Sequence, residues 1–177
     1  FQRSTSQQDE ERNRLVEAMK KSVSYMAKRR IGALISIERE TGLFEYIETG
    51  IKMNAEVSSE LLINIFIPNT PLHDGAVIIQ KDKIAAAACY LPLSESAFIS
   101  KELGTRHRAA LGLSEVTDAI TIVVSEETGA ISITANGTLH RNLNPQEFED
   151  LLSNLWFGDL QEVNASSKWT WGGKKNG

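Results

Sequence analysis

This 177-residue chain has few or none of the features that mark disulfide-bonded, membrane-spanning, secreted or nucleic-acid-binding proteins. There is one cysteine, Cys89, so no disulfide can form within the chain, and the apolar run around it predicts a buried thiol in a reducing compartment. No stretch approaches the roughly 20 apolar residues that cross a bilayer, and there is no signal peptide, so we expect a soluble polypeptide. The net charge is -4 and no basic stripe alternates with aromatics, which disfavours nucleic-acid binding.

What is present suits one compact domain. Hydrophobic residues make up 41% of the chain, enough for a full core at this length. We expect a globular domain over residues 10–157, between a flexible N-terminal segment, residues 1–9, and a flexible C-terminal tail, residues 158–177.

Hydrophobic periodicity predicts an α/β fold of the α+β type, a central mixed β-sheet covered by helices. The expected helices span residues 10–30, a short segment capped by Ser58 or Ser59, residues 106–113 with Thr105 as the cap, and a last segment after the capping residue Asn144. The expected strands span residues 31–38, 44–48, 76–80, 84–91, 121–125 and 130–135.

Two short segments carry the functional signal: PLHDGA at 71–76 and GTRHRA at 104–109. Each places a charged or titratable group beside a glycine, which lets a ligand approach the backbone closely. Asp74 can hold a divalent cation or take a proton from a hydroxyl, while Arg106 and Arg108 offer planar groups that grip phosphate oxygens. This chemistry suits a polyphosphate with its metal, and the pair indicates phosphoryl or nucleotidyl transfer.

Each segment also has an ordinary explanation. Asp74-Gly75 alone is typical of a turn, Arg106–Arg108 of a solvated helix start, and Glu126-Glu127 of a hairpin tip in water. Tyr90–Leu93 can end a core strand or wall an adenine pocket. A zinc site built from the three histidines is disfavoured because they are isolated from one another and from other ligands. A metal phosphohydrolase is disfavoured because its His-Asp pair lies within a helical bundle, whereas this one precedes a strand.

From about residue 15 to residue 155 the sequence resembles the diadenylate cyclase catalytic domain. Both signature motifs of that family are present, as Asp74-Gly75-Ala76 and Arg106-His107-Arg108, and Gly32-Ala33-Leu34-Ile35 is similar to its early strand motif. Three surrounding segments are similar to the membrane-bound subtype of firmicute bacteria: LHDG at 72–75, CYLPLS at 89–94 and SEETG at 125–129.

The resemblance implies an enzyme that condenses two ATP molecules into cyclic di-AMP and releases two pyrophosphates, using a divalent metal, Mn²⁺ or Mg²⁺ and also Co²⁺. Two domains would face each other, each holding one ATP, so catalysis would need a homodimer. The implied partners are a membrane-tethered regulator and phosphoglucosamine mutase. Because this subtype carries transmembrane helices before the domain, the resemblance implies a soluble fragment of a protein at the cytoplasmic face of the bacterial membrane.

The resemblance also implies roles for individual residues. Asp74 would be the catalytic residue, assisting the 3′-hydroxyl nucleophile directly or through a metal that His73 also binds. Nucleotide contacts are implied for Gly75, Ala76, Tyr90, Leu91, Gly104, Thr105, Arg106, His107, Arg108, Ser125 and Glu127. Two rival functions stay open: a non-catalytic adenine-nucleotide sensor, distinguished by whether ATP with metal turns over, and another nucleotidyl transferase, distinguished by the mass of its product.

Overall fold

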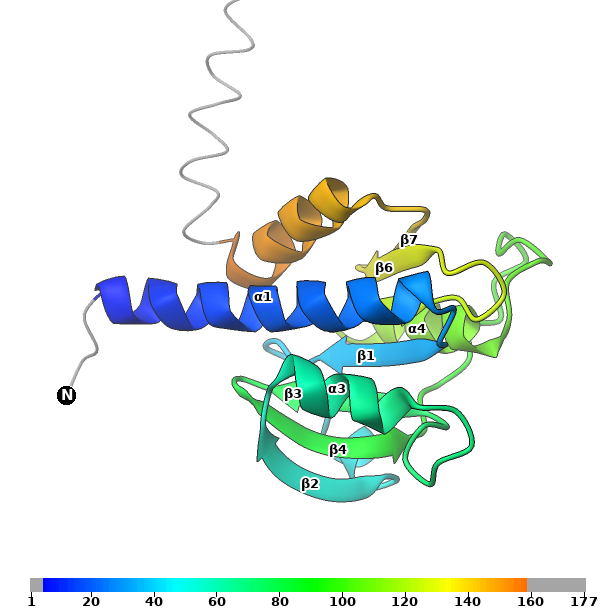
Figure 1. Cartoon of the computed structure of the whole chain (residues 1–177). Coiled ribbons are helices and arrows are strands. Elements are labelled where there is room, and N and C mark those ends of the chain that lie inside the picture. The colour runs from blue at the N-terminus through cyan, green and yellow to red at the C-terminus, as the bar shows by residue number, and fades with distance from the viewer. Residues whose placement is uncertain (1–4, 159–177) are drawn as a thin grey trace, which may run out of the picture.

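The computed structural model describes residues 5–158 and contains one seven-stranded sheet between two layers of helices (Figure 1). The helices are α1 (Thr5–Lys28), α2 (Phe44–Ile47), α3 (Ser59–Phe66), α4 (Thr105–Val116) and a last helix over residues 145–158. The strands are β1 (Ala33–Ile37), β2 (Ile51–Glu56), β3 (Ala76–Gln80), β4 (Lys83–Cys89), β5 (Ile120–Val124), β6 (Ile131–Ala135) and β7 (Thr138–His140).

The strand order is β2-β4-β3-β1-β5-β6-β7. Strands β1 and β3 are parallel, whereas the other neighbours are antiparallel, so the predicted mixed sheet is confirmed.

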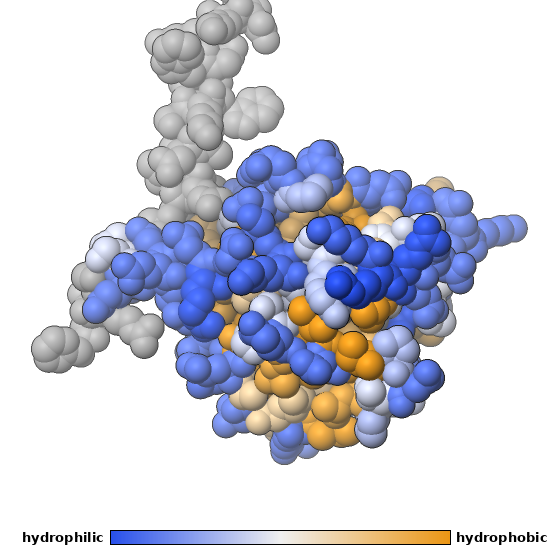
Figure 2. Space-filling view, in the orientation of Figure 1, coloured by the Kyte–Doolittle hydropathy of each residue, from blue (hydrophilic) through white to orange (hydrophobic). Residues whose placement is uncertain are grey.

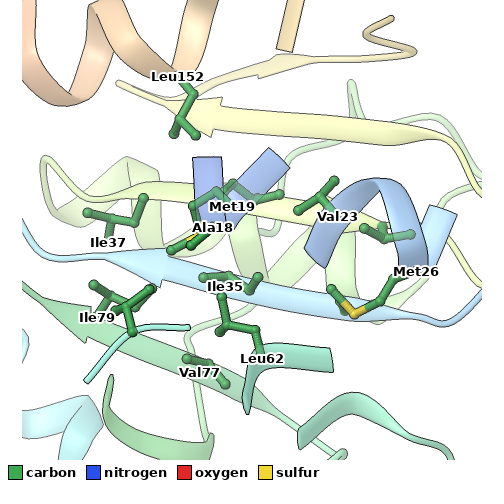
Figure 3. Close-up of a cluster of buried hydrophobic side chains, with 14 of the residues drawn as sticks. Ala18, Met19, Val23, Met26, Ile35, Ile37, Leu62, Val77, Ile79 and Leu152 are labelled. Atoms are coloured by element: carbon green, nitrogen blue, oxygen red, sulfur yellow. The ribbon is translucent and has the colours of Figure 1, made fainter. Parts of the chain in front are cut away.

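Alternate side chains of the central strand β1 enter two separate cores, as the pleat of a strand requires. Ile35 and Ile37 pack with α1, α3 and the last helix, while Leu34 packs with α2 and α4 on the opposite face. Figure 3 shows the first core, where Met19 and Met26 of α1 lie over β1. Because helices cover both faces of the sheet centre, a ligand site fits best at the ends of the strands.

The surface agrees with this layering. Figure 2 shows hydrophilic side chains along the outer face of α1 and a hydrophobic area around α3. Within residues 5–158, none of the helices combines the length and the apolar character that a membrane span needs.

Two predicted helix starts are confirmed by their hydrogen bonds. The Ser58 hydroxyl oxygen accepts a bond from the Leu61 backbone N–H at 3.1 Å and so caps α3. At the last helix, the Asn144 side chain accepts from the Glu147 N–H at 2.8 Å, and the Glu147 carboxylate accepts from the Asn144 N–H at 3.0 Å. This reciprocal pair is a capping box.

The start predicted for the first helix was wrong. Helix α1 begins at Thr5, so residues 5–9, which we expected in the flexible N-terminal segment, are helical. Their side chains are polar and exposed, so they add nothing to the apolar periodicity that marked the helix from residue 10. The tail predicted from residue 158 lies, apart from that residue, outside the described residues.

The strand predicted over 44–48 was also wrong, because this segment forms α2. Leu43 and Ile47 are buried four residues apart while Phe44 is exposed, which is helical spacing. Two strands were missed. Edge strand β2 is largely exposed and has little apolar signal, but β7 follows Asn136-Gly137, both at positive φ (52° and 73°), a recognisable two-residue hairpin turn.

Candidate active site

The ends of several strands bring the two motifs to one edge of the sheet. Because β3 runs parallel to β1, Asp74 before β3 lies at the same edge as Gly32 before β1. Strands β4 and β5 run antiparallel to these two, so Tyr90 after β4 and Ser125 after β5 also lie there. Segments far apart in the sequence therefore meet at this edge.

Gly75 in the first motif is required by the backbone. Its φ is +117°, and a Cβ at this position would lie 2.8 Å from the Ala88 carbonyl carbon and 2.9 Å from the Cys89 oxygen. The approach is close because β4 carries one extra residue opposite the stretch from Ala76 to Ile78, a β-bulge in which Ala88 has a φ of 55°. The glycine thus has a structural reason that does not involve a ligand.

Asp74 is exposed beside this bulge, and its carboxylate makes no hydrogen bond or ion pair within residues 5–158. The neighbouring His73 is half-buried, with Nδ1 2.7 Å from the Thr70 carbonyl oxygen. A carbonyl only accepts, so Nδ1 carries a proton. In the neutral imidazole, Nε2 then presents a lone pair, the arrangement typical of a metal-binding histidine.

These two residues alone do not make a complete metal site. In the part of the chain that the structure describes, no group of three or more His, Cys, Asp or Glu side chains could hold a metal ion. An ion at His73 and Asp74 would therefore take its other ligands from substrate phosphates and water, which is how Mg²⁺ usually binds at phosphoryl-transfer sites. The donor set fits a divalent cation on these terms.

The second motif begins α4. We expected Thr105 to cap a helix over 106–113, but Gly104 is the N-cap, Thr105 is the first helical residue and the helix runs to Val116. Gly104 makes no side-chain cap, so the first backbone N–H groups of α4 can meet an anion at the positive end of the helix dipole.

A pocket of about 230 Å³ opens between the start of α4 and the end of β5. It brings together six of the predicted site residues: Gly104, Thr105, Arg106, His107, Ser125 and Glu127. Seven others do not line it: His73, Asp74, Gly75, Ala76, Tyr90, Leu91 and Arg108. Lys101 and Glu126 also line the pocket. From the sequence, Glu126 was considered only as part of a hairpin tip, and Lys101 was not considered.

Arg106 is the central cation of the pocket. Its Nη1 lies 3.4 Å from the Glu126 carboxylate, and its guanidinium lies against Gly32. His107 beside it is buried, and burial, reinforced by the charges of Arg141 and Arg106, holds the pKa of His107 below its ordinary value. His107 is therefore neutral near pH 7 and adds a hydrogen-bonding group rather than a charge.

The loop after β5 is shaped by Ser125, whose hydroxyl oxygen accepts bonds from the backbone N–H groups of Glu127 (3.2 Å) and Thr128 (3.3 Å). This turn presents the exposed carboxylates of Glu126 and Glu127 at the pocket. The pocket thus holds charges of both signs, which suits an anion accompanied by a cation.

Tyr90 and Leu91, the two residues predicted to border the adenine, differ in exposure. Tyr90 is 79% exposed, whereas Leu91 is buried in the core beneath α4. The segment that follows is tied to α4 by the Ser94 N–H, which donates to the Arg108 carbonyl at 2.9 Å. Of these two residues, Tyr90 is the one that offers a free surface to a ligand.

Comparison with known proteins identifies the family. The family model described as DisA bacterial checkpoint controller nucleotide-binding (DAC) matches residues 20–139, a range that holds both motifs. The chain belongs to the DAC family. The cyclic di-AMP synthase CdaA of Bacillus subtilis is 61% identical to it over 177 residues, which is 100% of this chain and 64% of CdaA. The DAC chain thus spans less than two thirds of that relative.

Solved structures share the fold of this DAC domain. A crystal structure of a double mutant of DacA from Staphylococcus aureus is 63% identical, with a TM-score of 0.81, and the match covers 85% of this chain and 99% of DacA. A hypothetical membrane spanning protein from Bacillus cereus is 45% identical, with a TM-score of 0.70, over 72% of this chain and 63% of that one.

Proposed function

We propose that this chain is the catalytic domain of a diadenylate cyclase, which joins two ATP molecules into cyclic di-AMP and releases two pyrophosphates. The observation that carries the proposal is the convergence of Asp74 and the Arg106 pocket at one edge of the sheet in a DAC-family chain. The identity of 61% to a named cyclic di-AMP synthase supports it along the whole chain.

The pocket at the start of α4 is the proposed triphosphate site. Its volume of about 230 Å³ lies below the roughly 300–1,000 Å³ of pockets that enclose a drug-sized ligand, so it suits phosphates rather than a whole ATP. Arg106, Lys101 and the free helix amides would donate to phosphate oxygens. The nucleoside would lie outside this pocket, against Tyr90 and the half-buried Gly75 backbone. Ala76 is fully buried, so a nucleotide contact for it rests on the family resemblance alone.

A divalent ion would be held by His73 and Asp74, and we propose Mn²⁺, Mg²⁺ or Co²⁺. When bound, such an ion would offset negative charge on the phosphates. Glu126 and Glu127 face the same pocket, and their carboxylates would repel a bare triphosphate, which favours a metal-bound nucleotide as the ligand.

In the proposed step, the 3′-oxygen of one ATP attacks the α-phosphorus of the other. The new bond joins these two atoms, the bond from the α-phosphorus to the bridging oxygen breaks, and pyrophosphate leaves with the electron pair. Asp74 takes up the hydroxyl proton, while Arg106 stabilises charge on the leaving pyrophosphate. Two such attacks close the ring. A phosphate contact for Arg108, which does not line the pocket, rests on the family resemblance alone.

One domain has one such edge, so the two ATP molecules would require two domains that face each other. We therefore propose a homodimer as the active form. We also propose that the whole protein lies at the cytoplasmic face of the membrane, since the relatives are longer than this chain and one neighbour is described as membrane spanning. The proposed regulator and phosphoglucosamine mutase as partners rest on the family resemblance alone.

The test is to incubate the protein with ATP and Mn²⁺ over a range of protein concentrations and to identify nucleotides by anion exchange and mass. We expect cyclic di-AMP, with a specific activity that rises with concentration until the dimer saturates. Binding of ATP without any product would instead identify a sensor. A different nucleotide product would identify another transferase.

A further inference from the structure

Gly32 lies directly against the guanidinium of Arg106. A Cβ added at Gly32 would lie 2.5 Å from Nη1, 2.6 Å from Cζ and 3.0 Å from Nη2 of Arg106. All three nearest atoms belong to the charged group, so the guanidinium rests on bare backbone. Carbon atoms pack best at about 3.5–4.0 Å, so an alanine side chain and the guanidinium cannot share this space.

The backbone gives no other reason for a glycine here. Among residues 5–158 the glycines with positive φ are Gly75, Gly129 and Gly137, so Gly32 has a conformation that alanine adopts without strain. The side chain of Arg106 thus accounts for the missing Cβ.

The ion pair with Glu126 is too weak to hold Arg106 in place by itself. The two groups are 3.4 Å apart, but the Glu126 side chain is 63% exposed, and exposed pairs contribute little. The contact with Gly32 does not depend on charge, so water does not screen it.

We propose that Gly32 is a positioning residue, which seats the Arg106 guanidinium so that it faces the pocket and contacts the triphosphate. The inference rests on the proposed function only in taking ATP as the ligand. A guanidinium that is already seated loses less freedom when the phosphates bind, so more of its interaction appears as affinity.

Gly32→Ala should impair nucleotide binding without preventing folding. In Gly32→Ala, the atoms that must move are the far end of a long, flexible side chain, while the backbone conformation stays allowed. We therefore expect the variant to fold, with Arg106 displaced from the pocket.

The experiment measures the dissociation constant of 3′-deoxy-ATP with Mg²⁺ by calorimetry, because this nucleotide lacks the attacking hydroxyl and is not consumed. Adenosine, which has no phosphate, is the second probe. The proteins are wild type, Gly32→Ala, Arg106→Ala and the double variant. Gly42→Ala is the matched control, because Gly42 lies near the other end of β1, has no positive φ, and its added Cβ would meet nothing within 4 Å.

We expect Arg106→Ala to weaken 3′-deoxy-ATP binding about 10- to 100-fold, as loss of a charge-assisted contact does. Gly32→Ala should weaken it about 10-fold, and Gly42→Ala less than about 2-fold. Adenosine binding should stay unchanged in all variants. In the double variant, Gly32→Ala should add less than about 2-fold to Arg106→Ala, because no guanidinium remains to be displaced.

Three outcomes would overturn the proposal: unchanged 3′-deoxy-ATP binding by Gly32→Ala, additive effects in the double variant, or an equal loss of adenosine binding. If Gly32→Ala lowers the melting temperature, the melting temperature of the double variant is compared with that of Arg106→Ala. Without the guanidinium, Gly32→Ala should not lower the melting temperature further. A further decrease would also contradict the proposed contact between Gly32 and Arg106. The proposed cyclase activity is tested separately: it is contradicted if wild type makes no cyclic di-AMP from ATP, regardless of the binding results for the variants.

Discussion

Gly75→Ala should destabilise the fold strongly, and the structure allows its magnitude to be divided into two parts. A non-glycine residue at positive φ costs about 1–3 kcal/mol in backbone strain. The new Cβ would also meet the β4 backbone at 2.8–3.0 Å, and overpacking of this kind costs about 1–3 kcal/mol. The free energy of unfolding should therefore fall by about 2–6 kcal/mol, which corresponds to a melting temperature lower by roughly 5–20 °C for a chain of this size.

Two glycines serve as matched controls in thermal unfolding. Gly137 has a φ of +73° but nothing near its added Cβ, so Gly137→Ala should show the strain of about 1–3 kcal/mol alone. Gly42 has neither feature, and Gly42→Ala should lie within about 0.5 kcal/mol of wild type. If Gly75→Ala melts no lower than Gly137→Ala, the argument from close approach to β4 is refuted.

Three further predictions concern other groups. Burial raises the pKa of Cys89 to about 11, so the native thiol should react with a thiol reagent at pH 8 roughly 100-fold more slowly than in denaturant; comparable rates would contradict this. The pKa of His107 lies below 6.5, so the unfolded chain takes up this proton first, and stability should fall as pH drops below 6.5. Urea unfolding of His107→Gln should show a shallower decline there, and an unchanged slope would exclude His107 as the source. Asn144→Ala removes the capping box and should lower stability by about 1 kcal/mol, whereas the exposed helical change Asn154→Ala should not; equal effects would argue against the cap.

The elements that sequence reasoning found are those whose signal is local. Central strands such as β1 are continuous apolar runs, and the capping residues Ser58 and Asn144 act on groups within three residues. The elements that it missed lack such a signal or were misread. Strand β2 lies at the edge of the sheet with most side chains in solvent. Residues 44–48 were predicted as a strand, although Leu43 and Ile47 are buried at the four-residue spacing of a helix.

In the site, too, the features with a local sequence signal were predicted and those that depend on distant contacts were not. Its motifs were recognisable because Asp74 and Arg106 each lie within two residues of a glycine in a short segment. The seat that Gly32 makes for Arg106 depends on the packing of α4 against the start of β1, and nothing near Gly32 in the sequence reports that contact. Gly75 shows the converse, since a bulge in β4 accounts for a glycine that the motif alone associates with nucleotide binding.

The most direct test of the proposed activity compares wild type with Asp74→Asn on ATP and Mn²⁺, with cyclic di-AMP quantified by mass and ATP binding measured in parallel. The substitution keeps the shape of the side chain but removes the charge that would accept the proton and hold the metal. We expect cyclic di-AMP from wild type, a loss of at least about 100-fold in Asp74→Asn, as for removal of a general base, and binding largely retained. No cyclic di-AMP from wild type, or turnover by Asp74→Asn within a few-fold of it, would contradict the account.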